Sequence, residues 1–150
     1  MRYRDSASRG PTTPELPPLI VIAGATATGK TALSIALAHD LRGAEIVSAD
    51  SRQVYRDMDI ATAKPTAAEQ AAPPHHGLAL VEPAARFTAA DSRDAALAAL
   101  GDIGWRGGIG LLVGGTGLYL RTIARGLPLG RGDSDPSLRA QLEARLATGG

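Results

Sequence analysis

Apolar residues lie along this chain in short continuous runs, separated by longer segments in which they recur at helical spacing. The runs at 19–23, 45–49, 78–81 and 110–113 predict four short strands. The first is wholly apolar and partly β-branched, which is typical of a strand buried on both faces of a parallel sheet, and 110–113 is expected to be buried as well. Strands that alternate with helical segments indicate an α/β fold.

Helices are predicted in the segments between and after these runs. Leu33, Leu37 and Leu41 recur every four residues, which predicts an apolar helix packed on the sheet. Thr88, with an aspartate three residues later, forms a loose capping box for an amphipathic helix that runs to about residue 105. Two further helices are predicted at 118–124 and 136–147.

The turn between the first strand and the first helix carries the pattern G-x-x-x-x-G-K-[ST] of a phosphate-binding loop. Glycines let its N–H groups converge on a phosphate, and the helix N-terminus adds about half a positive charge. Lys30 would reach the outer phosphate, and the Thr31 hydroxyl would hold Mg²⁺. A dinucleotide site fits less well, because it needs G-x-G-x-x-G at this turn. The predicted diphosphate- or nucleotide-binding residues are Gly24, Ala25, Thr26, Ala27, Thr28, Gly29, Lys30 and Thr31.

These elements predict a P-loop NTPase-like parallel sheet flanked by helices, in three segments. Residues 1–18 are rich in Pro, Ser, Thr, Arg and Gly and are expected to be a disordered N-terminal extension. Residues 19–125 form the predicted P-loop α/β core. Residues 126–150 change to a Gly/Pro/Asp/Arg loop and a polar helix, which indicates the start of a different segment.

Two polar residues follow predicted strands at the same edge of the sheet as this loop. Asp50 ends the second strand and Thr116 follows the last, at the carboxyl edge where open parallel sheets bind their ligands. From position alone, Asp50 could also be a carboxylate in the second sphere of a metal, or the N-cap of a helix from Ser51. Thr116 could equally be a helix N-cap.

Composition limits the classes of function. The chain has 16 basic and 15 acidic side chains, so its net charge of +1 gives no general nucleic-acid signal. It has no cysteine, which excludes disulfides and thiolate metal sites, and only 3% aromatic residues, so platforms for base stacking are scarce. No run has the length of a membrane span, and we expect a cytoplasmic protein with no membrane partner. The pair His75-His76 lacks a third ligand and favours a structural or surface role.

Longer stretches resemble one family. Residues 47–65 resemble, almost residue for residue, the second signature of tRNA dimethylallyltransferases, also called tRNA isopentenyltransferases or the IPP transferase family. Residues 75–95 are similar to the family's middle block, and 112–120 to its glycine block. Ala25, Thr28 and Ala61 stand where the family usually has proline, serine and glycine, and none of these changes removes a group that contacts phosphate. Members are considerably longer, so the resemblance places this chain in the N-terminal half. It implies that residues 126–150 are the beginning of a helical insertion domain that binds tRNA, in a truncated chain.

The resemblance implies transfer of a dimethylallyl group from dimethylallyl diphosphate to N6 of adenosine 37 in tRNAs that read codons beginning with U. It implies Asp50 as the general base and Thr116 as a second catalytic residue, with Mg²⁺ as cofactor. A monomer is expected. Lys64, Arg121 and Arg125 are candidates for lining the path of the RNA backbone. The residues implied in tRNA binding are Asp50, Ser51, Arg52, Gln53, Thr116 and Arg139.

Individual members of this set carry alternatives. Gln53 could read an adenine edge with two hydrogen bonds. Ser51, Arg52 and Gln53 could instead be ordinary polar residues of a surface loop, and Arg139 an ordinary solvated charge on a helix face.

Three other functions remain open from the sequence. A small-molecule kinase would use Asp50 to activate a hydroxyl toward ATP, although no arginine-rich lid appears between residues 60 and 113. An adenylate isopentenyltransferase would take free AMP as the acceptor. A truncated chain could bind nucleotides or diphosphates and catalyse nothing.

Overall fold

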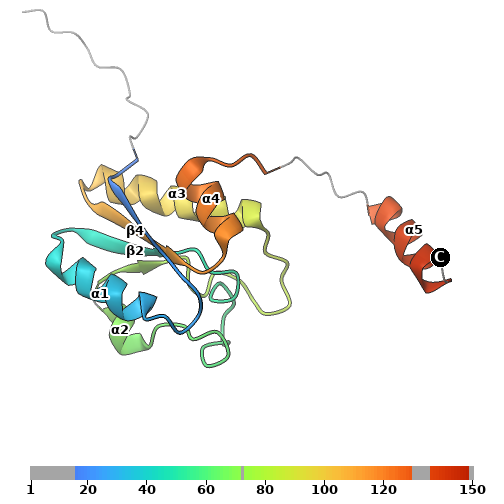
Figure 1. Cartoon of the computed structure of the whole chain (residues 1–150), viewed down its shortest axis with the longest axis horizontal. Helices are drawn as coiled ribbons and strands as arrows, with labels where there is room; N and C mark the ends of the chain where they lie inside the picture. Colours follow the sequence, from blue (N-terminus) through green and yellow to red (C-terminus); the bar gives the residue numbers. More distant parts are fainter. Residues whose placement is uncertain (1–15, 72, 130–135, 149–150) are drawn as a thin grey trace, which may run out of the picture.

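The computed structural model describes residues 16–71, 73–129 and 136–148. It holds a four-stranded sheet in the order β1-β4-β2-β3, in which each pair of neighbours is parallel (Figure 1). The strands are β1 (Leu19–Ala23), β2 (Ala44–Ser48), β3 (His75–His76) and β4 (Ile109–Gly114). The α/β class and the parallel sheet predicted from the sequence are therefore confirmed.

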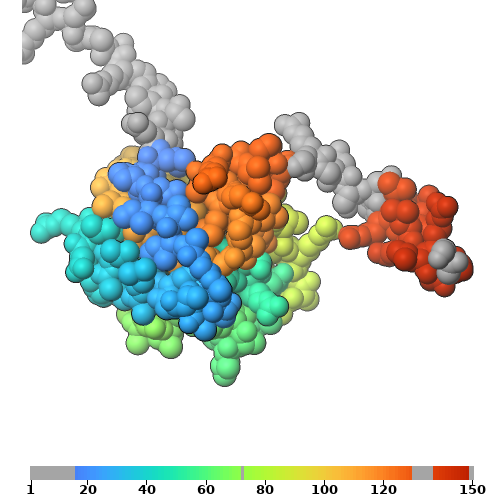
Figure 2. All heavy atoms as spheres, in the orientation of Figure 1, coloured from blue at the N-terminus to red at the C-terminus, as the bar shows by residue number. Residues whose placement is uncertain are grey.

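The described residues form five helices: α1 (Lys30–Asp40), α2 (Ala67–Ala71), α3 (Ala89–Trp105), α4 (Gly117–Arg125) and α5 (Pro136–Ala147). Of these, α1 covers one face of the sheet, and α3 and α4 cover the other. Figures 1 and 2 show α5 lying apart from the α/β body. None of the helices in the described ranges is both long and apolar enough to cross a membrane.

Alternate residues of the central strands face two separate cores, because successive side chains of a strand point to opposite faces. Val47 and Leu112 are fully buried against α3 and α4, in a cluster centred on Leu100 and Ile103. Ile46, Leu111 and other residues of β2 and β4 pack on the opposite face against α1. Packing on both faces sets the positions of β2 and β4 relative to the helices. It therefore also sets where the loops after these two strands begin.

The burial predicted for the first strand and its helix is wrong in part. Within the described residues β1 is an edge strand, and Ile20 and Val21 are 38% and 44% exposed. Leu33 is 52% exposed, because α1 packs through the small buried residues Ser34 and Ala38 instead. Small side chains allow the helix to approach the sheet closely and leave the leucine outside.

The strand predicted at 78–81 is also wrong. β3 is His75–His76, and the chain leaves the sheet at Gly77, whose φ is +79°. A Cβ there would lie 2.6 Å from the Ser48 carbonyl oxygen, so glycine permits this close turn. The following residues pair with the loop after β2: the Leu80 N–H donates to the Val54 carbonyl at 2.7 Å. An apolar run therefore packs along a loop and adds no strand to the sheet.

The predicted capping box of α3 is confirmed. The Thr88 hydroxyl accepts a hydrogen bond from the Asp91 N–H at 3.2 Å, and the Asp91 carboxylate accepts one from the Thr88 N–H at 2.8 Å. Two N–H groups that the helix leaves unpaired are satisfied in this way. The box fixes where α3 begins.

A charged cluster joins β2, β3 and the end of α3 away from the pocket. The Glu45 side chain is 12% exposed and accepts hydrogen bonds from Arg106 at 2.8 Å and from the His76 ring N–H at 2.7 Å. Burial by itself would raise the pKa of Glu45, but the hydrogen bonds from Arg106 and His76 outweigh it and lower the pKa below 4.5. His76 thus has the structural role expected from the sequence.

Replacing Glu45 with glutamine should lower the free energy of unfolding by roughly 1–3 kcal/mol at pH 7, since hydrogen bonds to the charged carboxylate are lost. Because the pKa is lower in the folded state, this stabilisation is complete above pH 4.5 and disappears as the pH falls through the folded value. Urea unfolding from pH 7 to pH 3 measures it. The difference in unfolding free energy between Glu45→Gln and the parent chain should disappear at acid pH. Glu82→Gln, at an exposed ion pair, should have nearly the unfolding free energy of the parent at every pH.

Candidate functional site

A pocket of about 910 Å³ opens at the carboxyl edge of the sheet, where β1, β4 and β2 end side by side. Three loops that are distant in sequence form it: 24–31 after β1, 49–53 after β2, and 114–116 after β4. Residues 60–63 and Pro65 line it as well. The strand order thus brings together the residues that the sequence placed at one edge of the sheet.

The loop after β1 has the backbone of an anion cradle. Gly29 precedes α1 with φ +84°, and Ala27 also lies in the left-handed region at φ +65°. The Thr28 hydroxyl and the Lys30 ammonium both donate to the Ala25 carbonyl, at 2.8 and 2.6 Å. The first N–H groups of α1 lack partners within the helix and point into the loop, where an anion can accept from them.

The Asp50 carboxylate is fixed by its own loop. Its Oδ1 accepts a hydrogen bond from the Arg52 N–H at 2.8 Å, and residues 51–54 form turns, so Asp50 does not cap a helix. In the described parts of the chain, no hydrogen bond to Oδ2 is found. One oxygen thus holds the orientation while the other is left for a ligand in the pocket that Asp50 lines.

Thr116 lies in the same pocket, directly before α4. It occupies the N-cap position, but its hydroxyl makes no capping hydrogen bond. Thr116 is therefore the N-cap residue by position only, because its side chain does not cap the helix. Its hydroxyl is available to a ligand.

Two glycines let the three loops approach one another. A Cβ on Gly114 would lie 2.5 Å from the carbonyl oxygen of Ala49, the residue before Asp50. A Cβ on Gly115 would lie 3.2 Å from the carbonyl oxygen of Gly24. The glycine block of the sequence is thus needed where the end of β4 contacts both neighbouring loops.

Gly114→Ala should lower the free energy of unfolding by about 1–3 kcal/mol, because backbone and not a flexible side chain must move to make room. Urea unfolding followed by circular dichroism measures it. Gly101→Ala is the matched control: nothing lies within 4 Å of its new Cβ, so alanine inside α3 should stabilise by about 0.5–1 kcal/mol. Equal effects of the two substitutions would contradict the crowding at Gly114.

Comparison with known proteins fits this geometry. A family model described as IPP transferase matches residues 53–150, and one described as isopentenyl transferase matches residues 17–72.

The chain belongs to the IPP transferase family.

Relatives of the family share most of this chain. A tRNA dimethylallyltransferase of Roseiflexus sp. (strain RS-1) is 55% identical over 87% of the chain and 42% of its own length. The full-length tRNA isopentenylpyrophosphate transferase of Bacillus halodurans has 43% identity and a TM-score of 0.72, over 89% of this chain and 44% of that one. A eukaryotic dimethylallyltransferase, crystallised acting on tRNA, has 37% identity and a TM-score of 0.67, over 72% of this chain and 26% of that one. The chain spans less than half the length of these relatives.

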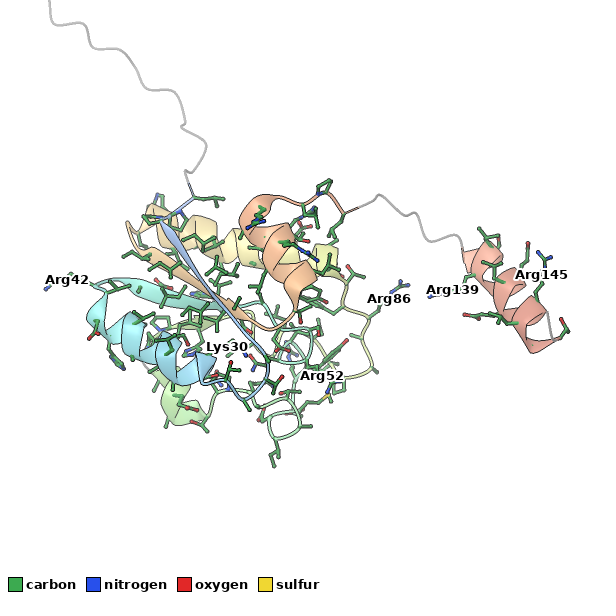
Figure 3. The ribbon with its side chains drawn as sticks, viewed as in Figure 1. Lys30, Arg42, Arg52, Arg86, Arg139 and Arg145 are labelled. Carbon is green, nitrogen blue, oxygen red and sulfur yellow. The ribbon has the colours of Figure 1, made fainter. Side chains whose placement is uncertain are left out.

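The tRNA-binding residues implied by the family resemblance lie in different places. Ser51 and Arg52 line the pocket, and Figure 3 shows Arg52 at the same end of the sheet as Lys30. Gln53 lines it too, but its amide is occupied by protein partners: it accepts from the Ser48 hydroxyl and donates to the carbonyls of Thr62 and Ala63. Two hydrogen bonds to an adenine edge would require these contacts to break.

Arg139 is not brought to the pocket. It lies on α5, with a largely exposed side chain 3.6 Å from Glu143. A contact between Arg139 and tRNA stays a prediction, as do the roles of Arg121 and Arg125, which are exposed on α4.

The prediction that Lys64 lines an RNA path is wrong. Its side chain is only 3% exposed, and its ammonium donates to the Tyr55 carbonyl and to Asp59. Residues 60–63 and Pro65, which line the pocket, received no site role from the sequence. The signal available was the continuous family match at 47–65, since composition and spacing alone indicate only a loop there.

The donor set at the pocket fits Mg²⁺. Thr31 supplies a hydroxyl in the phosphate loop, and the described residues hold no cluster of three or more His, Cys, Asp or Glu that would favour a metal held by protein alone. Mg²⁺ usually keeps several waters and takes few protein ligands besides substrate phosphates. A family member could therefore bind the ion together with a diphosphate.

Proposed function

We propose that the protein is a tRNA dimethylallyltransferase that prenylates N6 of adenosine 37 in tRNAs reading codons that begin with U. The observation that carries the proposal is the convergence of the phosphate loop, Asp50 and Thr116 on one pocket, in a chain of the IPP transferase family. The names of its relatives support the same chemistry. A tRNA substrate would place the reaction in the cytoplasm, and we expect a monomer.

The phosphate loop would bind the diphosphate of dimethylallyl diphosphate. As the allylic C–O bond breaks, negative charge grows on the departing pyrophosphate, and the loop N–H groups and the Lys30 ammonium stabilise it. Lys30 would exchange its present acceptor, the Ala25 carbonyl, for a phosphate oxygen. Thr31 would hold Mg²⁺, which when bound supplies further positive charge to the diphosphate.

Asp50 would act on the acceptor amine. N6 of adenine is a weak nucleophile that must lose a proton as its bond to the allylic carbon forms, and a carboxylate within hydrogen-bond reach accepts that proton. The Arg52 N–H holds Oδ1 in place, so Oδ2 is the atom that faces N6. The products are the N6-prenylated adenosine, pyrophosphate and a proton on Asp50.

The acceptor base has to leave the stack of the anticodon loop to enter the pocket, which costs less for a loop base than for a paired one. Thr116 would offer its uncapped hydroxyl to the flipped nucleotide. Ser51 and Arg52 would contact the neighbouring backbone, where Arg52 adds affinity without sequence preference.

The experiment uses the protein expressed from its complete coding sequence, with labelled dimethylallyl diphosphate. An anticodon stem-loop with adenosine at position 37 should take up label only when Mg²⁺ is present. The same hairpin with inosine at that position should take up none, because inosine lacks the N6 amine. Labelling of free AMP, or phosphoryl transfer from ATP, would overturn the proposal in favour of an adenylate isopentenyltransferase or a kinase. Running the 150-residue chain in parallel tells whether this portion is active alone.

A further inference from the structure

The loop at 50–64 forms one wall of the pocket, although it has no regular secondary structure. It runs from the end of β2 toward α2 through a series of turns, and both Asp57 and Ala63 adopt a left-handed backbone, with φ of +55° and +49°. A loop of this length loses much conformational entropy when it is ordered. Specific contacts must therefore hold it where it carries Asp50 and Arg52.

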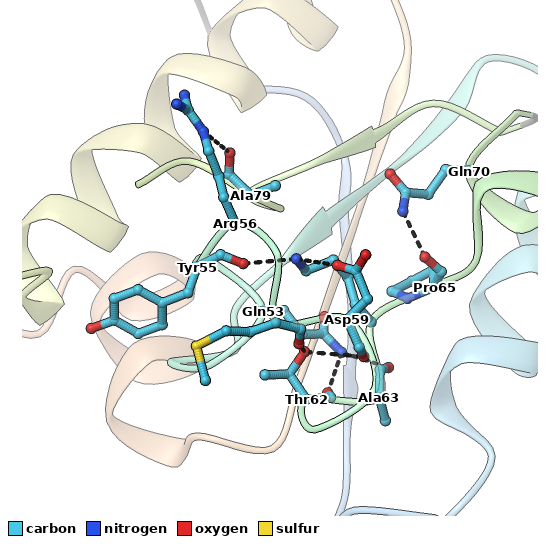
Figure 4. Close-up of polar contacts among 11 residues, drawn as sticks. Gln53, Tyr55, Arg56, Asp59, Thr62, Ala63, Pro65, Gln70 and Ala79 are labelled. Carbon is cyan, nitrogen blue, oxygen red and sulfur yellow. Dashed lines mark hydrogen bonds and ion pairs between the residues drawn. The ribbon is translucent and has the colours of Figure 1, made fainter. Parts of the chain in front are cut away.

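The first contact is a buried ammonium. Lys64 Nζ donates to the Tyr55 carbonyl at 2.7 Å and to Asp59 Oδ1 at 2.6 Å (Figure 4). The Lys64 N–H also donates to the Asp59 carbonyl at 3.1 Å. Because a buried charge is costly unless it is paired, the loop can keep Lys64 inside only while Tyr55 and Asp59 stay folded around it.

The second contact is the amide of Gln53. Its Oε1 accepts from the Ser48 hydroxyl at the end of β2, at 3.0 Å. Its Nε2 donates to the Ala63 carbonyl at 3.1 Å and, more weakly, to the Thr62 carbonyl at 3.4 Å (Figure 4). One side chain thus joins the last residue of the strand to the far end of the loop.

These two contacts hold different parts of the loop. Gln53 joins the loop to β2 close to Asp50 and Arg52, and Lys64 joins its middle to its end. Arg56 adds a further attachment through an ion pair with Glu82 at 2.7 Å, but the side chains of both Arg56 and Glu82 are more than half exposed. Of these groups, Lys64 is the buried one, and Gln53 is half-buried.

We propose that Lys64 and Gln53 are positioning residues, which close the loop at 50–64 and so hold the Asp50 carboxylate and Arg52 at the pocket. The inference rests on the proposed function for what Asp50 does, and on the geometry alone for how the loop is held. It gives Gln53 a role different from direct reading of an adenine edge, because its donors and its acceptor already have partners.

The test compares Lys64→Met and Gln53→Glu with the parent, in the protein expressed from its complete coding sequence. Methionine keeps much of the lysine volume without the charge, and glutamate keeps the shape of glutamine but turns an acceptor toward two carbonyls. Arg42→Met is the matched control, since it changes the net charge equally at an exposed site outside the pocket. The measurements are hydrogen exchange of residues 50–64, kcat and KM with the anticodon hairpin, and the Kd of inorganic pyrophosphate.

Both variants should exchange at 50–64 at least about tenfold faster and should lose about tenfold or more in kcat, while the Kd of pyrophosphate changes less than about twofold. Arg42→Met should match the parent in every measurement. Lys64→Arg should recover part of the lost kcat, because arginine restores a cation that can reach the same acceptors. This separation of kcat from pyrophosphate binding is what a general loss of stability would not produce.

Three results would overturn the inference. The first is a Lys64→Met variant whose hydrogen exchange at 50–64 and kcat equal those of the parent. The second is a Gln53→Glu variant with a raised KM for RNA and unchanged hydrogen exchange, which would make Gln53 a direct RNA contact. If Lys64→Met does not fold, Asp59→Asn replaces it, since the Asp59 side chain is 69% exposed. The third result is an Asp59→Asn variant whose hydrogen exchange at 50–64 equals that of the parent. A parent that prenylates no RNA defeats the proposed function, and the exchange data still decide how the loop is held.

Discussion

Asp50→Asn should lower the kcat of prenyl transfer by about 10²- to 10⁴-fold, the usual contribution of a positioned general base. Asparagine can still accept the hydrogen bond from the Arg52 N–H, so the turn should survive while the proton acceptor is lost. The KM values for dimethylallyl diphosphate and for the hairpin should change little. Steady-state kinetics with the anticodon stem-loop measure all three quantities.

Asp102→Asn is the control for this substitution. Asp102 is exposed near the end of α3 and lies outside the pocket lining, so its loss should leave kcat unchanged. An Asp50→Asn enzyme with the kcat of the parent would show that another group, or solvent, takes the N6 proton.

Lys30→Met should weaken binding of inorganic pyrophosphate by roughly 10- to 150-fold, which corresponds to about 1.5–3 kcal/mol for a hydrogen bond to a charged group. The loss in kcat should be greater than the loss in affinity, because charge on the pyrophosphate grows as the C–O bond breaks. Calorimetric titration with pyrophosphate and single-turnover kinetics measure the two effects separately.

Arg42→Met again serves as the comparison, since it removes a cation outside the pocket lining and should leave pyrophosphate affinity unchanged. Lys30→Arg tests geometry against charge: arginine keeps the cation but is bulkier, and should restore only part of the affinity. Tight pyrophosphate binding by Lys30→Met would mean that the loop amides and the helix terminus suffice.

Local patterns predicted the elements of the fold well. The bounds of β1 and α5 agree with the sequence analysis, and the capping box places the start of α3 correctly. Strand order was not predictable in this way, since the hydrophobicity of 19–23 does not tell whether the strand is central or at an edge. The apolar run at 78–81 was misassigned because its partner is a loop, which no periodicity reveals.

The site was predictable where chemistry follows the ends of strands. The phosphate loop, Asp50 and Thr116 lie in one pocket because parallel strands end at the same edge. Lys64 was misjudged because a lysine in a polar loop is usually exposed, and its burial depends on the fold of residues 55–59 around it. The occupied amide of Gln53 could not be read from sequence for the same reason.

The position of β4 between β1 and β2 has a consequence for synthesis of the protein. The first two strands emerge early from the ribosome, yet they contact each other only through a strand that is made much later. Until residue 114 has been translated, no strand holds the phosphate loop after β1 next to the Asp50 loop after β2. During this time β1 and β2 expose unpaired apolar strands to the cell. A nascent chain of this topology depends on how quickly β4 arrives, which makes ribosome pausing before residue 109 a hazard for its folding.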